Sequence, residues 1–237
     1  MGAESVRAIT ESCVELGVEY LTLYAFSSEN WKRPKGEVAA LMKLLELYLA
    51  NEEAELMSKN IRLQAIGRLH DLPESTQREL HRVIEATSQN TAMTLILALS
   101  YGSRDEIVDG VKSIADSVRK GHLDSAMINA DVLSKHLYTR YYPDPDLLIR
   151  TSGEMRLSNF LLWQLSYAEF YITETLWPDF GAADVQAAVE AFRSRERRFG
   201  RTSDQVRREA GHAVRTVAGA PASAGDLAVK AAIVGTQ

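Results

Sequence analysis

Cysteine is almost absent from this sequence, because Cys13 is the only one among 237 residues. A single thiol excludes a disulfide framework and any metal site built from several cysteines, and it suits a reducing compartment. Long hydrophobic runs are missing as well, since no apolar stretch reaches the roughly 18 residues of a membrane-spanning helix. We therefore expect a globular protein located in the cytoplasm.

An overall excess of positive charge is also missing. The formal net charge is -5, so no basic field favours a nucleic-acid partner. Positive charge gathers only locally, in an arginine-rich run between Arg193 and Arg215 that contains Phe199 as its one aromatic residue. This run has two interpretations, a solvated helix end facing acidic groups or a contact with phosphate or a partner. We expect no binding of nucleic acid.

The rest of the composition is that of an ordinary globular domain, with 46% hydrophobic and 25% charged residues. A domain of this size buries roughly 70% of its unfolded surface, so a full core is available. Beyond Ala218 the composition turns to Ala, Gly, Ser and Val and contains no aromatic residue. We therefore predict one domain over residues 1–200 and an Arg/Ala-rich tail of unknown role over residues 201–237.

Strand-like and helix-like segments alternate along this domain. Apolar residues at helical spacing predict helices over residues 5–16, 34–49, 74–87, 104–118, 160–165 and 182–197. Apolar runs predict strands over residues 20–25, 61–66, 93–99, 147–149 and 170–172. The alternation indicates an α/β protein with a single open, mainly parallel sheet flanked by helices. Ligands of such sheets bind beyond the carboxyl ends of the strands, so the loops after strands are the places to seek chemistry.

Two of these loops stand out. Residues 27–33 place hydroxyl, amide, carboxylate, indole and cationic groups in one turn, where small donors can bind an anion and Trp31 offers an apolar wall. Residues 150–158 carry Arg150 and Arg156 around a glycine turn, and two guanidinium groups can clamp a diphosphate from two sides. For either loop the alternative is structural, a helix N-cap with ion pairs at the surface.

Glu169 is a third candidate. It lies beside a predicted strand among residues that otherwise have the pattern of buried ones. A carboxylate in such surroundings is costly unless it is paired or bound to a cation. Two interpretations stay open, a magnesium ion shared with a phosphate or a buried pair with an arginine.

Longer runs resemble the cis-prenyltransferases, the family of the undecaprenyl diphosphate synthases or isoprenyl transferases. The resemblance covers about residues 2–200 and is carried by residues 21–34, 148–163, 167–169 and 176–180, in that order. It implies an enzyme that uses Mg2+ to condense isopentenyl diphosphate with an allylic diphosphate, such as farnesyl diphosphate, into a long-chain polyprenyl diphosphate. It also implies a homodimer, and a transient association with the membrane surface through the lipid product.

The resemblance assigns roles to individual residues. Asn30 matches a catalytic residue, and because a neutral amide is a poor base, orienting a diphosphate or a proton path is the easier role to accept. Glu169 matches a magnesium ligand. An apolar tunnel for the growing chain would be lined by Ala25, Leu45, Met93 and Leu99, for which ordinary core packing is the alternative. The residues that match substrate-binding positions are Ser27, Ser28, Glu29, Trp31, Arg33, Arg150, Arg156, Leu157 and Ser158.

One part of the family pattern has no match. Family members begin with a strand and an Asp-Gly-Asn-Gly-Arg loop that holds the allylic diphosphate and magnesium, whereas this sequence begins in the helix that follows, and its tail holds no displaced copy. We therefore expect an undecaprenyl diphosphate synthase-like sheet with the first strand missing, and impaired activity. The alternative is an inactive homologue that serves as a binding or scaffold subunit of a prenyltransferase dimer. An unrelated nucleotide-binding protein is disfavoured, because no glycine fingerprint is present.

Overall fold

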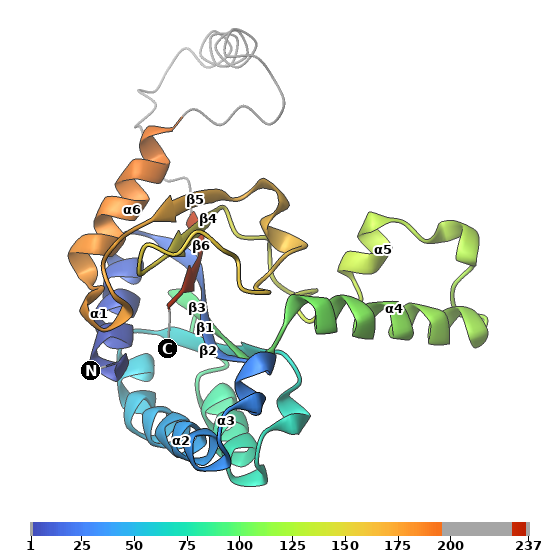
Figure 1. Ribbon diagram of the computed structural model, residues 1–237, viewed down its shortest axis with the longest axis horizontal. Coiled ribbons are helices and arrows are strands. Elements are labelled where there is room, and N and C mark those ends of the chain that lie inside the picture. Colours follow the sequence, from blue (N-terminus) through green and yellow to red (C-terminus); the bar gives the residue numbers. More distant parts are fainter. Residues whose placement is uncertain (1, 196–228, 236–237) are drawn as a thin grey trace, which may run out of the picture.

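The computed structural model describes residues 2–195 and 229–235 (Figure 1). Within these residues, six strands form one sheet with the order β2-β3-β1-β6-β4-β5, in which every neighbouring pair is parallel. The strands are β1 (Val18–Ser27), β2 (Ile61–Ile66), β3 (Met93–Tyr101), β4 (Leu147–Arg150), β5 (Glu169–Ile172) and β6 (Val229–Val234). The α/β class and the open parallel sheet expected from the sequence are confirmed.

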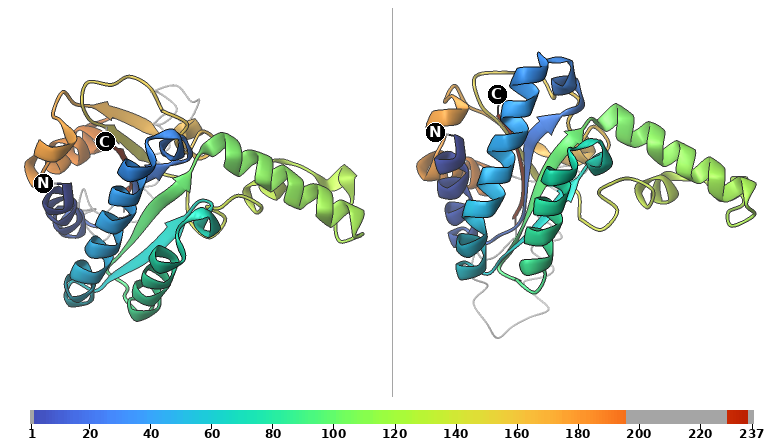
Figure 2. Two further views of the ribbon diagram at one scale, coloured as in Figure 1. Left: turned by 60° about the horizontal axis from the view of Figure 1, so that its bottom comes forward. Right: turned by 90° about the horizontal axis from the view of Figure 1, so that it is seen from below.

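The α-helices gather mainly on one face of this sheet. They are α1 (Gly2–Glu15), α2 (Lys35–Ser58), α3 (Glu74–Ala86), α4 (Ser103–Arg119), α5 (Ala130–Ser134) and α6 (Ala182–Ser194). The buried side chains of α1, α2, α3 and α6 form one core cluster with the sheet, whereas α4 and α5 project from it as an arm (Figure 2). No helix in the described part of the chain is both long and apolar enough to cross a membrane.

Helix boundaries follow local chemistry. Pro34 and Pro73 stand at the N-cap positions of α2 and α3 with φ of −51° and −54°, which the proline ring fixes. Gly17 follows α1 with φ of +72°, a conformation that glycine adopts without strain. Cys13 is a free, buried residue of α1, and burial raises the pKa of its thiol to about 12. The thiol therefore stays protonated and packs as an apolar side chain.

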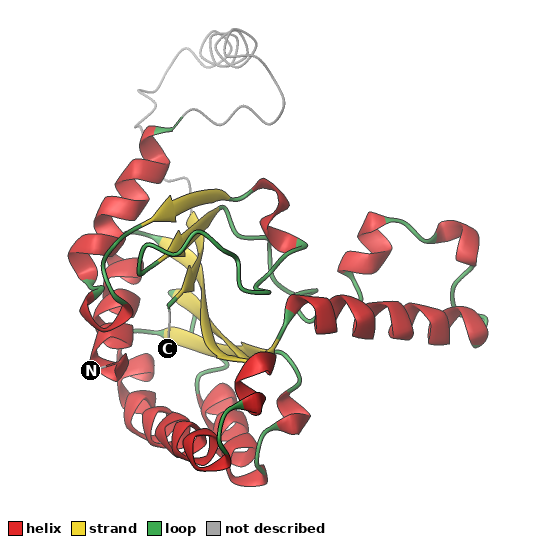
Figure 3. Ribbon diagram, viewed as in Figure 1, coloured by secondary structure: helices red, strands yellow, loops and turns green. Residues whose placement is uncertain are grey.

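The other face of the sheet is covered mainly by loops (Figure 3). Phe160 is fully buried there and stacks on Tyr24 with 4.5 Å between ring centroids. The sequence predicted a short helix over residues 160–165, and this prediction is wrong. Ser158, Asn159 and Leu161 have φ of +52°, +61° and +46°, which no right-handed helix contains, and only a 3-10 turn follows at Gln164–Tyr167.

β6 lies at the centre of the sheet, between β1 and β4, although it comes last in the sequence (Figure 1). Ala231 pairs in register with Leu21 of β1 and with Leu147 of β4. Val229, Ala231 and Ile233 belong to the core cluster on the helical face, and Ala232 and Val234 belong to the cluster on the other face. The sequence analysis missed this strand, because its small residues lie in a segment whose composition indicated a tail. Of the predicted tail and the arginine run, all but residues 193–195 and 229–235 lies outside the described residues.

The parallel arrangement brings the carboxyl ends of β1, β6 and β4 to one edge of the sheet. Ser27, Val234 and Arg150 are the last residues of these strands. From β1 the chain continues to β2 and β3 on one side, whereas β4 and β5 lie on the other, so the topology reverses here. The loops 27–33 and 150–158 therefore meet at the place where open α/β sheets bind ligands.

Candidate active site

Two adjoining cavities lie at this edge of the sheet. One is polar, with a volume of about 430 Å³, and the other is apolar, with a volume of about 260 Å³. Both are lined by Tyr24 and Gly235, so the two cavities meet beside these residues. Seven of the predicted site residues line the polar cavity, namely Ser27, Glu29, Asn30, Arg33, Arg150, Arg156 and Ser158. Ser28, Trp31, Leu157 and Glu169 are not among its lining residues.

The loop 27–33 folds as a capped 3-10 turn. Ser27 Oγ accepts a hydrogen bond of 3.3 Å from the backbone N–H of Asn30, and Asn30 Oδ1 accepts one of 2.8 Å from the backbone N–H of Ser27. Arg33 forms an ion pair of 2.8 Å with Glu37. The structural interpretation of this loop therefore holds for these residues. The cap also fixes the Asn30 side chain and leaves its Nδ2 without a hydrogen bond to any described residue, so this group can donate to a ligand.

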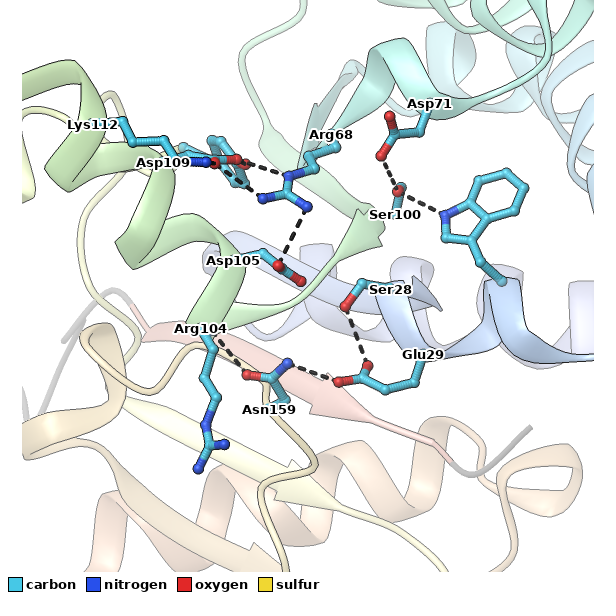
Figure 4. Close-up of polar contacts among 12 residues, drawn as sticks. Ser28, Glu29, Arg68, Asp71, Ser100, Arg104, Asp105, Asp109, Lys112 and Asn159 are labelled. Atoms are coloured by element: carbon cyan, nitrogen blue, oxygen red, sulfur yellow. Dashed lines mark hydrogen bonds and ion pairs between the residues drawn. The ribbon is translucent and has the colours of Figure 1, made fainter. Parts of the chain in front are cut away.

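Residues of other elements hold Trp31 through a hydrogen bond and a ring contact. Its Nε1–H donates to Ser100 Oγ at 2.9 Å, and Ser100 in turn donates to Asp71 at 3.3 Å (Figure 4). The indole also packs edge-on against Phe26, with 4.9 Å between ring centroids. Trp31 therefore helps to support the loop, and no sequence pattern indicated its contacts with Ser100 and, through Ser100, with Asp71.

The two arginines of the second loop differ sharply in their surroundings. Arg150 is only 5% exposed, its Nε has no hydrogen-bond partner, and it forms no ion pair with any described residue. Burial lowers the pKa of its guanidinium. Arg156 is 68% exposed in its side chain and forms an ion pair of 2.8 Å with Glu154. A buried cation without a partner is costly, so Arg150 marks the cavity as a site for an anion.

Glu169 lies at the amino-terminal ends of the strands, opposite the end that carries the polar cavity. It begins β5 and pairs in register with Leu147, the first residue of β4, whereas Arg150 at the end of β4 pairs with Ile172. Its carboxylate accepts from Arg195 at 3.2 Å, so the glutamate–arginine interpretation is the one observed, with partly exposed side chains. No group of three metal-ligating side chains occurs among the described residues. Glu169 does not fit a cation shared with an anion in the polar cavity of the same chain, and its role as a metal ligand stays a prediction.

The apolar cavity lies between the sheet and α2. Three of the four predicted tunnel residues, Ala25, Leu45 and Leu99, line it. Met93 does not, because it begins β3 at the other edge of the sheet and is buried in the core. The C-terminal strand contributes Ile233, and Gly235 follows it, where an added Cβ would lie 2.6 Å from the ring of Trp177. The cavity thus depends on residues that the sequence analysis placed in a tail.

A polar network fastens the start of α4 beside the site (Figure 4). Arg68, in the loop after β2, donates two hydrogen bonds to Asp109 at 2.8 and 3.0 Å and pairs with Asp105 at 3.3 Å. Hydrogen bonding from Arg68 lowers the pKa of Asp109. The network joins two elements that the sequence could not place side by side.

Comparison with known proteins agrees with this geometry. Residues 1–200 match the prenyltransferase family described as undecaprenyl diphosphate synthase. An isoprenyl transferase from Porphyromonas gingivalis is 50% identical over 205 residues, which cover 86% of this chain and 81% of that protein. One from Geobacter sulfurreducens is 49% identical and is covered to 83% of its length. The chain belongs to this family.

The prenyltransferase fold is confirmed by a solved structure. The lavandulyl diphosphate synthase from Lavandula x intermedia, in complex with dimethylallyl diphosphate, matches with a TM-score of 0.81 and 39% sequence identity. The match covers 84% of this chain and 86% of that chain. The family of prenyl-transferring enzymes that the sequence resembled is therefore the one to which the chain belongs.

Sequence reasoning missed several residues of the polar cavity. Tyr24, Asn159, Val234 and Gly235 all line the polar cavity. Tyr24 was assigned to a buried strand, and Asn159 follows the second loop directly, so its position beside Ser158 was the available signal. Val234 and Gly235 carried no such signal, because only the pairing of β6 brings them to the site.

Proposed function

We propose that this prenyltransferase condenses isopentenyl diphosphate with an allylic diphosphate to form a longer polyprenyl diphosphate. The observation that carries the proposal is the buried Arg150, which has no ion-pair partner among the described residues and lies in a polar cavity that adjoins an apolar one. A diphosphate head group and a hydrocarbon chain match this pair of cavities in charge and polarity. The names of the relatives, isoprenyl transferases, support the same chemistry.

The reaction places definite demands on these residues. The bond between the allylic carbon and its diphosphate breaks, a carbon–carbon bond forms to isopentenyl diphosphate, and a proton leaves, so that free diphosphate is the second product. Negative charge grows on the departing diphosphate, and fixed cations and amide donors stabilise it. In this proposal Arg150 and Arg156 hold oxygens of isopentenyl diphosphate, whose diphosphate does not depart. Asn30 Nδ2 donates to a diphosphate in the same cavity, and the apolar cavity takes the hydrocarbon chain.

The family also implies a metal ion, and Mg2+ is the ion we propose, because it binds phosphate oxygens together with one or two carboxylates. Such an ion would neutralise diphosphate charge. Since the surroundings of Glu169 do not fit this role within one chain, we assign no residue to the ion. Glu29 is the carboxylate that lines the polar cavity.

A homodimer in the cytoplasm, with transient contact to membrane surfaces, belongs to the same proposal. β5 is an edge strand of the sheet and exposes Phe170 and Ile172, and Tyr167 just before it is 82% exposed. Apolar and aromatic side chains at an edge strand are typical of a surface that another chain covers. Membrane contact is expected because the product of the proposed reaction is a lipid.

Replacement of Arg150 tests the proposal. Arg150→Met should weaken the binding of isopentenyl diphosphate, measured by calorimetry with and without Mg2+, by about 10- to 150-fold, because hydrogen bonds to charged groups are lost. The free energy of unfolding should stay the same or rise, since the variant removes a buried cation that has no ion-pair partner in the described part of the chain. Loss of binding without loss of stability separates a ligand-binding arginine from a structural one.

The matched control is Arg119→Met, which removes an exposed arginine paired with Asp116 near the end of α4. It should change neither affinity nor turnover of farnesyl diphosphate with labelled isopentenyl diphosphate. An Arg150→Met protein that binds normally, or that unfolds more easily than the control, would overturn the assignment. Binding of isopentenyl diphosphate without any turnover would favour the scaffold subunit over the enzyme.

A further inference from the structure

Asn159 connects the two loops of the polar cavity (Figure 4). Its Nδ2 donates a hydrogen bond of 2.8 Å to Oε1 of Glu29, and its Oδ1 accepts one of 2.9 Å from the backbone N–H of Arg104. Its backbone carbonyl accepts from the N–H of Ser103 at 2.7 Å. One residue therefore joins the loop 27–33, the end of the loop 150–158 and the first turn of α4.

The contacts of Asn159 with α4 take the place of an N-cap side chain, which this helix lacks. Gly102 stands at the N-cap position of α4 and forms no side-chain cap bond. Asn159 Oδ1 accepts from the second N–H of the helix, which is the bond that an N-cap side chain normally supplies. A Cβ on Gly102 would lie 2.4 Å from Ser28 Oγ and 2.7 Å from Asn159 Nδ2. The glycine is therefore required for both side chains to reach this end of the helix.

The backbone around Asn159 is held in an uncommon conformation. Asn159 has φ of +61°, which asparagine tolerates better than most residues, but Leu161 has φ of +46°, where leucine is strained. Such a turn persists only when its surroundings determine it. The contacts of Asn159, and the hydrogen bond of 2.9 Å from the Leu162 N–H to Ser103 Oγ, are interactions that hold it. The same turn presents Ser158 to the cavity.

The hydrogen bond to Glu29 also governs the charge of the cavity. Glu29 is the carboxylate among the lining residues, and its two oxygens accept from Asn159 Nδ2 and, at 3.4 Å, from Ser28 Oγ. A carboxylate occupied in this way is not drawn into a pair with an arginine of the cavity, which would neutralise the cation that an anion needs. Arg150 accordingly keeps no anionic partner among the described residues.

We propose that Asn159 is a positioning residue. It sets the loop 27–33 against the loop 150–158 and holds the Glu29 carboxylate apart from the arginines that bind the ligand. The inference rests on the proposed function only in taking a diphosphate as that ligand. The contacts between the loops stand without it.

Three variants test this role by calorimetry with isopentenyl diphosphate. Asn159→Ala removes both side-chain bonds without adding charge, and Asn159→Asp keeps an acceptor for the Arg104 N–H but places a carboxylate beside Glu29. Each should weaken binding by about tenfold. In the double variant Asn159→Asp with Glu29→Gln, the new amide at position 29 can donate to the new carboxylate at position 159. The hydrogen bond between the two loops is then restored with its direction reversed, and most of the affinity should return.

Asn129→Ala is the matched control. Asn129 caps α5 through a bond of 3.0 Å from the Val132 N–H to its Oδ1, remote from the cavity. This variant should lower stability without changing affinity. The proposal would be overturned if the control lost as much affinity as Asn159→Ala, or if the double variant recovered none. In either case the role of Asn159 would be limited to capping α4.

Amide hydrogen exchange in residues 27–33 gives a readout that needs no ligand. Asn159→Asp should speed exchange there but not at the start of α4, where the Arg104 N–H keeps its acceptor, and the added Glu29→Gln should slow exchange again in residues 27–33. If the unmodified protein does not bind isopentenyl diphosphate, the proposed function fails, while the exchange measurement still decides the role of Asn159. Unchanged exchange in residues 27–33 would contradict that role.

Discussion

Replacement of Ile233 by alanine should destabilise the protein by about 3 kcal/mol. Ile233 is 1% exposed in β6 and lies opposite Leu23 of β1 and Ile149 of β4. The change removes three buried carbon groups, worth about 0.8 kcal/mol each, and the space left behind adds a further cost. Ile233→Val removes one such group and should cost about 1 kcal/mol. The graded pair measures how tightly the central strand is packed.

Urea unfolding followed by circular dichroism measures this effect. With a slope of about 2–3 kcal/mol/M, the midpoint for Ile233→Ala should fall by about 1–1.5 M, with the slope unchanged. Val108→Ala is the control, because Val108 is 49% exposed on α4, and it should change stability by less than about 0.5 kcal/mol. If Ile233→Ala changed stability no more than this control, residues 229–234 would not occupy the centre of the sheet.

Two further predictions concern a glycine and a buried acid. Gly67 has φ of +117° and an added Cβ would lie 2.0 Å from the Leu99 carbonyl oxygen, so Gly67→Ala should cost about 3 kcal/mol or more in thermal or urea unfolding. Gly36→Ala, where no atom lies within 4 Å, should instead stabilise by about 0.4–1 kcal/mol, and equal effects would refute the steric argument. Burial raises the pKa of Glu106 above its ordinary 4.5, so the stability that its protonation provides is complete below that value. This stability is lost as pH rises through the raised folded pKa, and a pH series of unfolding measurements should show a decline that Glu106→Gln lacks. Parallel curves for the two proteins would contradict it.

Local pattern was sufficient for most of the fold. Helical spacing of apolar residues predicted α1, α3 and α4 closely, and short apolar runs predicted β1 to β5 within a few residues. These patterns can be recognised in the sequence because the residues that an element buries on one face recur with the period of that helix or strand. The short α5 went unpredicted, and residues 160–165 were wrongly predicted to be helical. Their apolar side chains cover the sheet from a turn with positive φ, which apolar content alone does not reveal.

The sequence predicted which residues form the site better than it predicted the contacts that these residues make. The loops 27–33 and 150–158 do meet, because parallel strands place their carboxyl ends at the same edge. The lack of an ion-pair partner for Arg150 within residues 2–195 and 229–235, and the pairing of Glu169 with Arg195, could not be read from the sequence, since each depends on which charged groups the other elements bring near. The missing aspartate loop and its effect on activity stay predictions.

Residue types at short and regular spacing were enough to predict the family, the parallel sheet and the two loops that line the polar cavity. The tertiary structure decided that β6 lies between β1 and β4, and that Asn159 reaches Glu29. The pairing of β6 with β1 and the contact of Asn159 with Glu29 each join segments more than a hundred residues apart. The packing of the whole sheet determines which segments pair, and no local sequence pattern in one segment identifies its partner.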